Sequence, residues 1–283
     1  MAYLVYRFGW RELLSVLSAA SPAWLMLVVA LVAAGYLLRA WKWRVALGPG
    51  RRAVELFFLA KSAGNWTPGR VGELAPLLLG EHRNARVAAW ILADRVIEIW
   101  LTVGLGLMGG LSLALVQPAS LILMGVAFVL VSGMGVYVVL RWNPAATLSS
   151  SSLLARILKF AHIVRGEILA LGLKGPALLL LTVAAKVTDV WAVMALFQAF
   201  GHGVNFLLVC AARFAHALVS ASPLTPDSTG VPYVAAAALL HERAAIPPAT
   251  LITALSFEAL IIFGMAHMGL MAASAIRSRT PAE

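Results

Sequence analysis

Long runs of apolar residues limit what this chain can fold into. Five runs approach or exceed the ~18 residues that a helix needs to cross a bilayer. They lie at residues 24–38, 87–109, 120–140, 177–200 and 250–276. Charged residues make up only 12% of the chain, whereas soluble domains carry roughly 25%. The runs therefore predict an all-α polytopic membrane protein, in which residues 1–283 form a single integral membrane domain.

The basic residues predict how the spans are oriented. The formal charge is +10 at pH 7, and we expect it to face lipid headgroups at the ends of the spans rather than nucleic acid. Suppose that five spans cross the membrane in alternating directions and that each of the two interrupted segments returns to the side from which it entered. Fourteen basic residues, including Arg39 and Lys42, then lie on the same side of the membrane. Arg7, Arg11 and Arg243 fall on the other side. Because basic loops stay in the cytoplasm, the bias predicts an N-terminus outside and a C-terminus inside.

The stretch NWTPGRVGEL, residues 65–74, puts helix breakers and charges between apolar segments. Residues 53–64 before it would make a helix of about 18 Å at 1.5 Å per residue, which is too short for the ~30 Å hydrocarbon core. Pro68 and Gly69 then break the helix, and residues 71–80 form a second short one. Irregular backbone is tolerated at membrane depth only where protein or water covers it. We therefore expect a re-entrant helical hairpin that lines a cavity.

The second half of the chain repeats this pattern. Residues 224–242 parallel residues 66–82, because both contain Thr-Pro with a glycine four residues after the proline. Further correspondences are Lys61 with Arg213 and Glu98 with Glu258. Each half then reads as span, re-entrant hairpin, span, and the predicted orientation inverts the second half relative to the first. Inverted repeats are common in transporters, which bind substrate at the repeat interface near the midplane.

The repeat divides the chain into four segments. These are an interfacial amphipathic helix (1–21), a first repeat with an extra span (22–145), a cytoplasmic amphipathic linker (146–175) and an inverted second repeat (176–283). The predicted architecture is thus an inverted repeat with about five full spans plus two re-entrant hairpins.

Charged residues also occur at membrane depth, where each costs about 2.5–3.5 kcal/mol at the centre of a span. The basic ones are Lys61, Arg70, Arg95, Lys186 and Arg213, and the acidic ones are Glu73, Asp94, Glu98, Asp189, Asp227 and Glu258. Helical spacing predicts an ion pair between Arg95 and Glu98. The same spacing predicts one between Lys186 and Asp189. Such pairs either hold the repeats together or serve function. Arg70, at the tip of a broken hairpin beside helix N-termini, suits an anion such as a phosphate headgroup.

Catalytic motifs are absent from the sequence, which has no GxSxG elbow, no P-loop and no HExxH. The single cysteine, Cys210, cannot form an intramolecular disulfide, and no Cys/His cluster suits a metal ion. We therefore expect no cofactor, no metal and no enzyme activity. A membrane transferase that binds a lipid phosphate could nevertheless use the same arginine and glutamate residues.

The charged motifs resemble those of one family. Residues 65–73, NWTPGRVGE, are similar to the N-x-x-P-G-R-x-G-E/D motif of the lysylphosphatidylglycerol synthase transmembrane region, also called the flippase-like domain family. Residues 94–98 resemble its E-R-L-x-D pattern with the acids exchanged, and residues 39–44, RAWKWR, resemble its R-x-x-R/K-W-R. Residues 223–230 match the prolines and the last glycine of its second-half motif. The resemblance covers most of residues 22–275.

The resemblance implies a polytopic membrane domain of bacteria or archaea that translocates lipids. In the best-known branch the lipid is an aminoacylated phosphatidylglycerol, made by an attached synthase domain. We expect this protein to be a stand-alone member without that domain. Related stand-alone members are associated with hopanoids and with polyprenyl-linked glycolipids. The chain departs from the family pattern where Asp227-Ser228 replaces a glycine pair and where Glu258 stands at a commonly basic position. This more acidic second half favours a headgroup with positive charge or sugar hydroxyls besides phosphate.

We therefore predict a flippase-like lipid transporter of the bacterial inner membrane that binds a lipid headgroup between two re-entrant hairpins. The predicted headgroup contacts are Asn65, Arg70, Glu73, Asp94, Arg95, Glu98, Lys186, Asp189, Asp227, Ser228 and Glu258. The predicted hinges are Pro68, Gly69, Gly72, Pro226 and Gly230. The expected ligand is a phospholipid, a hopanoid or a polyprenyl-linked glycolipid. The alternatives are a membrane accessory subunit of a partner lipid-synthesis enzyme and a lipid-modifying enzyme.

Overall fold

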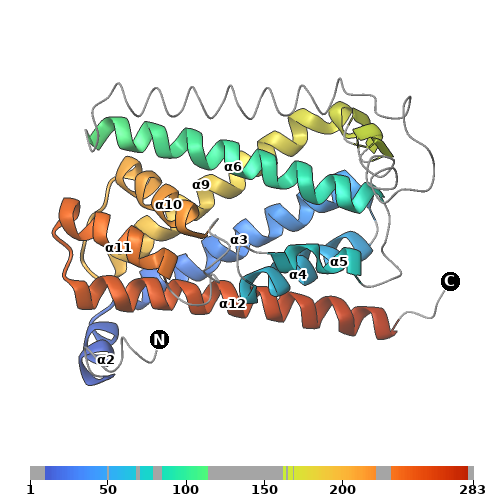
Figure 1. Ribbon diagram of the computed structural model, residues 1–283. Coiled ribbons are helices and arrows are strands. Elements are labelled where there is room, and N and C mark those ends of the chain that lie inside the picture. Colours follow the sequence, from blue (N-terminus) through green and yellow to red (C-terminus); the bar gives the residue numbers. More distant parts are fainter. Residues whose placement is uncertain are drawn as a thin grey trace.

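The computed structural model consists of helices and short connections in the residues that it describes. These residues are 10–49, 51–67, 71–78, 85–113, 162–163, 165–167, 169–220 and 231–279. In chain order (Figure 1) the elements are α2 (Trp10–Ser18), α3 (Pro22–Leu47), α4 (Arg51–Trp66), η1 (Val71–Leu74), α5 (Ala75–Leu78), α6 (Ala85–Leu113), η3 (Gly172–Lys174), α9 (Gly175–Ala199), α10 (Phe206–Ser220), α11 (Val231–Ala244) and α12 (Pro248–Arg279). No strand occurs within these ranges, so the predicted all-α class is confirmed.

Among the described residues, three helices are long and apolar enough to cross a membrane: α3, α9 and the Pro248–Ser274 part of α12. They coincide with the apolar runs at 24–38, 177–200 and 250–276. α6 has 29 residues, enough to cross a bilayer, and carries charges at its middle. The run at 120–140 lies outside the described residues, so the number of spans stays a prediction.

α3 and α9 lie together in the middle of the bundle. They pack along each other more extensively than any other pair of described helices, and in Figure 1 they lie between α6 and α12. Gly35 of α3 lets the two backbones approach, because a β-carbon there would lie 3.1 Å from the hydroxyl oxygen of Thr188 on α9. Small residues at such contacts are a usual basis of helix association in membranes.

The shorter helices connect the two halves of the chain. α4, from the first half, packs against α12 of the second half, and α10, from the second half, packs against α6 of the first. Glycine also occurs at both contacts. Gly269 of α12 faces the ring of Phe58, and Gly109 of α6 faces the backbone of α10. Each half is therefore held to the other through a short helix.

Both predicted helix interruptions fall between described helices. α4 ends at Trp66 and is followed by η1 and α5, so the second short helix predicted at 71–80 begins as a 3₁₀ turn. In the second half, α10 ends at Ser220 and α11 begins at Val231. The predicted hinge and site residues that lie outside the described residues are Pro68, Gly69, Arg70, Pro226, Asp227, Ser228 and Gly230. The re-entrant course of both hairpins therefore stays a prediction.

Gly109→Ala should destabilise the contact between α6 and α10. A methyl group there meets backbone atoms of α10, so the helices must separate, and overpacking of this kind costs about 1–3 kcal/mol. Gly104→Ala is the matched control on the same helix, because a β-carbon at Gly104 meets nothing within 4 Å. Thermal unfolding in detergent, followed by size-exclusion chromatography, should show a lowered midpoint for Gly109→Ala alone. Equal midpoints for the two variants would contradict this packing.

Candidate functional site

Charged side chains from five helical elements meet inside the bundle, and we call them the central charge network. Its members are Arg39 and Lys42 of α3, Lys61 of α4, Glu73 of η1, Asp94, Arg95 and Glu98 of α6, and Lys186 and Asp189 of α9. Helix geometry brings them to common faces, because residues three or four apart are neighbours on a helix surface. The members on α3 and α9 are three apart, and two of those on α6 are four apart.

Glu98 on α6 is the hub of the network. It is 7% exposed. Three cations of the described residues lie near its carboxylate oxygens: Arg39 Nε at 3.8 Å, Lys42 Nζ at 3.5 Å and Lys61 Nζ at 3.9 Å. Lys186 on α9 acts on it electrostatically as well. One carboxylate therefore faces cations from three other helices.

Two further acids, Asp189 and Asp94, form ion pairs with Arg39 and Lys42, which also lie near Glu98. Asp189 on α9 pairs with Arg39, and Lys186, one turn earlier on that helix, acts electrostatically on Asp189. Asp94, one turn before the hub on α6, pairs with Lys42. Lys42 is fully buried, so its ammonium group relies on the acids of α6 for compensation.

Glu73 joins the network from the 3₁₀ turn η1. Its carboxylate pairs with Lys61 at 3.1 Å and with Arg95 of α6. The turn is positioned by Thr67, whose hydroxyl accepts a hydrogen bond from the backbone N–H of Gly72 at 2.6 Å and donates to a carbonyl oxygen of α4 at 3.2 Å. A β-carbon at Gly72 would meet the backbone of α4. The glycine therefore permits the close approach that brings Glu73 to its cations.

The network carries one more positive than negative charge, because its five bases outnumber its four acids. A buried charge without a partner is strongly destabilising, so these side chains stabilise the fold as a set. The excess charge makes the network a complement for one anionic group. Lysine and arginine side chains bind phosphate oxygens well, with arginine able to do so through two parallel hydrogen bonds.

Asn65 lies one turn after Lys61 on α4, so the two side chains share a helix face. It is 9% exposed, and its Nδ2 has no hydrogen-bond acceptor among the described residues. A buried donor without an acceptor costs about 1–3 kcal/mol. Its amide is therefore a candidate for contact with a ligand.

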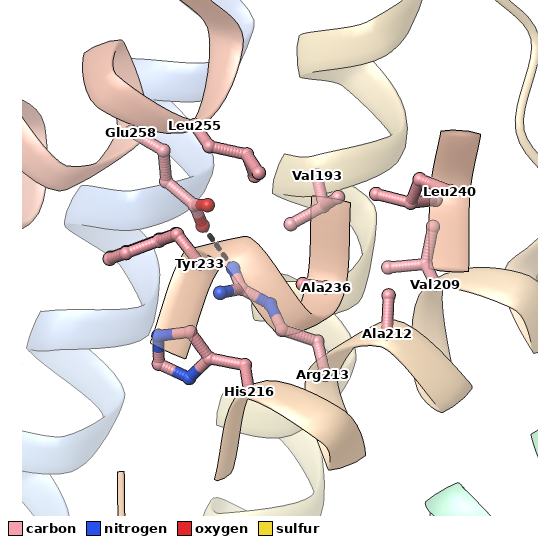
Figure 2. Close-up of a pocket in the computed structure, with 10 residues that line it drawn as sticks. All are labelled: Val193, Val209, Ala212, Arg213, His216, Tyr233, Ala236, Leu240, Leu255 and Glu258. Atoms are coloured by element: carbon pink, nitrogen blue, oxygen red, sulfur yellow. Dashed lines mark hydrogen bonds and ion pairs between the residues drawn. The ribbon is translucent and has the colours of Figure 1, made fainter. Parts of the chain in front are cut away.

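A smaller charged site lies in the second half of the chain. Arg213 of α10 pairs with Glu258 of α12, and Figure 2 shows the guanidinium group pointing at the carboxylate. His216 and Tyr233 border the same small cavity, with ring centres 4.6 Å apart. The predicted site residue Glu258 thus has a pair of its own, outside the ion pairs of the central charge network.

The structure corrects one predicted pair and adds an unpredicted partner to a residue of the other. Arg95 pairs with Glu73, so the predicted pair with Glu98 is wrong. The reason is that η1 brings a carboxylate to Arg95, whereas Glu98 faces the cations of α3 and α4. Asp189 has an ion-pair partner that helical spacing did not predict, Arg39 of α3.

The expectation that Arg39 and Lys42 face lipid headgroups is wrong. α3 continues to Leu47, so both lie within the helix and reach the acids of α6 and α9. Trp41 between them is 65% exposed, as expected where one helix face turns inward and the other outward. The sequence does indicate that further cations lie at membrane depth. The charged residues predicted there are six acids and only five bases, so at least one more base is needed to compensate the acids.

Three apolar helices of membrane-spanning length among the described residues, with charged side chains buried between them, indicate an integral membrane protein. The family model described as the lysylphosphatidylglycerol synthase TM region matches residues 1–275. The chain therefore belongs to this family, as its motifs predict, and the family is a membrane domain with lipid-related functions. Comparison with curated proteins and with solved structures gave no match.

Lys42→Met should destabilise the protein strongly, because it leaves the buried Asp94 without its ion-pair partner. Removing one partner of a buried pair costs about 3–5 kcal/mol. Adding Asp94→Asn removes the orphaned charge and should restore part of the lost stability. Arg243→Met, at an exposed position of α11, is the control and should leave the thermal unfolding midpoint unchanged. A double variant less stable than Lys42→Met would show that the two residues are not paired.

Proposed function

We propose that the protein binds the headgroup of a membrane lipid at the central charge network and moves that lipid across the bilayer, as a flippase-like transporter. The observation that carries the proposal is the network itself, in which five bases and four acids lie within a bundle of membrane-spanning helices. Charges inside spans usually mark a substrate or ion pathway, because burying them is costly. Membership of a family with lipid-related functions supports the same class of substrate.

A phosphate-bearing headgroup suits the charges of the network. The single excess positive charge matches one phosphodiester group. Lys61 and Arg95 share the carboxylate of Glu73, and side-chain rotation would let both turn toward phosphate oxygens. Charge-assisted hydrogen bonds of this kind are among the strongest in proteins. Asn65 would add an amide donor on the same face of α4, and Arg70, in the same motif, would add a further cation.

We also propose an inverted repeat of span, re-entrant hairpin and span, in which α3 corresponds to α9, α4 to α10 and α6 to α12. The helix contacts support this correspondence, since α4 packs on α12 as α10 packs on α6. The charges support it as well. Lys61 of α4 lies near Glu98 of α6. In the other half, Arg213 of α10 pairs with Glu258 of α12. Transporters of this architecture bind substrate between the repeats.

Further parts of the proposal follow from the sequence. Asp227 and Ser228 would contact the headgroup from the second hairpin and favour positive charge or sugar hydroxyls on it. The protein would have about five spans, an N-terminus outside and a place in the bacterial inner membrane. It would not be an enzyme, because the sequence carries none of the catalytic motifs sought above. Transport would then be driven by an ion gradient or be passive.

Lipid transfer can be tested in liposomes with fluorescent phosphatidylglycerol and phosphatidylcholine analogues, using dithionite to quench the outer leaflet. Lys61→Met should slow transfer at least about tenfold, which corresponds to ~1.4 kcal/mol of lost interaction. Lys61→Arg keeps the positive charge and should retain most of the transfer, because the corresponding residue of the second half, Arg213, is an arginine. Glu242→Gln, at an exposed position of α11, should behave as the unchanged protein does.

The outcomes distinguish the alternatives. Equal rates for protein-free liposomes and for the unchanged protein would overturn transport. A new lipid species in mass spectra would indicate the lipid-modifying enzyme, and stoichiometric co-purification of a lipid-synthesis enzyme would indicate the accessory subunit. Full transfer by Lys61→Met would place the headgroup site outside the central charge network.

A further inference from the structure

The Arg213–Glu258 pair leaves part of its carboxylate unused. Arg213 Nη2 donates to Oε1 of Glu258, whereas Oε2 is buried and has no hydrogen-bond donor among the described residues. The whole residue is 1% exposed. A buried acceptor without a donor is costly, and a bound proton or water molecule removes that cost. Glu98, the corresponding acid of the first half, differs because three cations surround it.

Glu258 borders a small cavity beside this pair (Figure 2). The cavity volume is about 10 Å³, which is room for about one water molecule. Its polar lining residues are Arg213, His216, Tyr233 and Glu258, and the others are apolar. A buried water needs several polar partners, and these side chains can supply them. His216, one turn after Arg213 on α10, also contacts Ser220 through Nδ1 at 3.4 Å.

We propose that Glu258 is a proton-binding site, loaded through this cavity, and that its protonation loosens the contact of α10 with α12. One proton from the solvent passes through His216 and a water molecule in the cavity to Oε2 of Glu258, and both His216 and the water end in the protonation state in which they began. Arg213 keeps its own proton, so the pair changes from neutral to singly positive. The ion pair then becomes a hydrogen bond to a neutral acid, which is the weaker interaction.

The groups around Glu258 allow its charge to affect the first half of the chain. The titratable and charged groups that face it are Arg213 and His216 from α10, Tyr233 from α11 and Asp189 from α9. Arg39 of α3 and Lys61 of α4 are engaged by acids of the central charge network. Asp189 pairs with Arg39 and also acts electrostatically on Glu258 and Arg213. It therefore connects the two charged sites.

The proton would serve as the driving ion, and in this respect alone the inference rests on the proposed lipid transport. A change of charge at Glu258 would reach the headgroup site through Asp189 and Arg39. Weakening of the Arg213–Glu258 pair would at the same time loosen α10 from α12, while α10 stays packed against α6 of the first half. Binding of the proton itself needs no lipid and can be measured separately.

Infrared spectra of the full-length protein in liposomes should show a carboxylic acid carbonyl band that grows as the pH falls from about 9 to about 5, a range that includes buried glutamates. Glu258→Gln should lose this titration, because an amide cannot bind the proton. Glu242→Gln, exposed on α11, should keep it. Glu258→Asp should keep a band with a shifted midpoint, which separates loss of the site from misfolding. An unchanged titration in Glu258→Gln overturns the proposal.

Cys210 reports whether α10 moves. It is the single cysteine of the chain and lies buried on α10, one turn before Arg213. Its alkylation rate with N-ethylmaleimide, divided by the rate of detergent-unfolded protein at the same pH, should rise at least about tenfold from about pH 9 to about pH 5, as expected for local opening. Glu258→Gln should react fast at both values. Slow, pH-independent alkylation in both proteins overturns the loosening.

These measurements separate the two proposals. If the infrared band titrates and depends on Glu258 while the liposomes show no lipid transfer, the proton site stands and the proposed function fails. If lipid transfer occurs at the same rate with and without an imposed pH gradient, the role of the proton as driving ion is overturned. If Glu258→Gln also abolishes the response of transfer to the gradient, both proposals are supported together.

Discussion

A carboxylate buried among membrane helices must be compensated, and this requirement sets the positions of the helices around Glu98. A charge left alone in the hydrocarbon core is strongly disfavoured, so cations have to come from whichever helices can supply them. α3 supplies Arg39 and Lys42, and α4 supplies Lys61. Arg39 also holds α9 through Asp189. One acid therefore fixes the positions of four helices relative to one another. Apolar contacts do this less well, because lipid chains can make the same contacts with a helix.

The arrangement that stabilises the bundle also suits an exchange of partners. The cations around Glu98 lie at 3.5 to 3.9 Å and are shared with other acids. Lys61, for example, contacts both Glu73 and Glu98. When an ion pair between two residues without other partners opens, both charges are left unpaired. When a cation shared by two acids turns away from one of them, that acid still has a second cation as its partner. A phosphate group can therefore enter the network without stranding a buried charge. In the proposed function, stability and headgroup binding would then depend on the same side chains.

Sequence patterns locate the helices of this protein better than the contacts between them. Runs of apolar residues place α3, α9 and α12 because length and hydropathy are local properties. The choice of ion-pair partner is not local. Helical spacing favours Glu98 for Arg95, but it contains no information about η1, which brings Glu73 there. Arg39 and Lys42 are misplaced because the apolar run ends at residue 38, although α3 continues once its charges have partners.

The two halves of the chain place matching charges in unequal surroundings. Glu98 has several cations, whereas Glu258 pairs with Arg213 and keeps one oxygen without a donor among the described residues. An acid enclosed by cations holds its charge and positions its neighbours, while an acid with one cation beside a water-sized cavity can change its charge. In the proposed repeat, one unit would in this way supply the substrate site and the other the proton site. Asp189 pairs with Arg39 and acts electrostatically on Glu258, so in the proposed mechanism it is the residue through which a change of charge in one half would alter the pairing in the other.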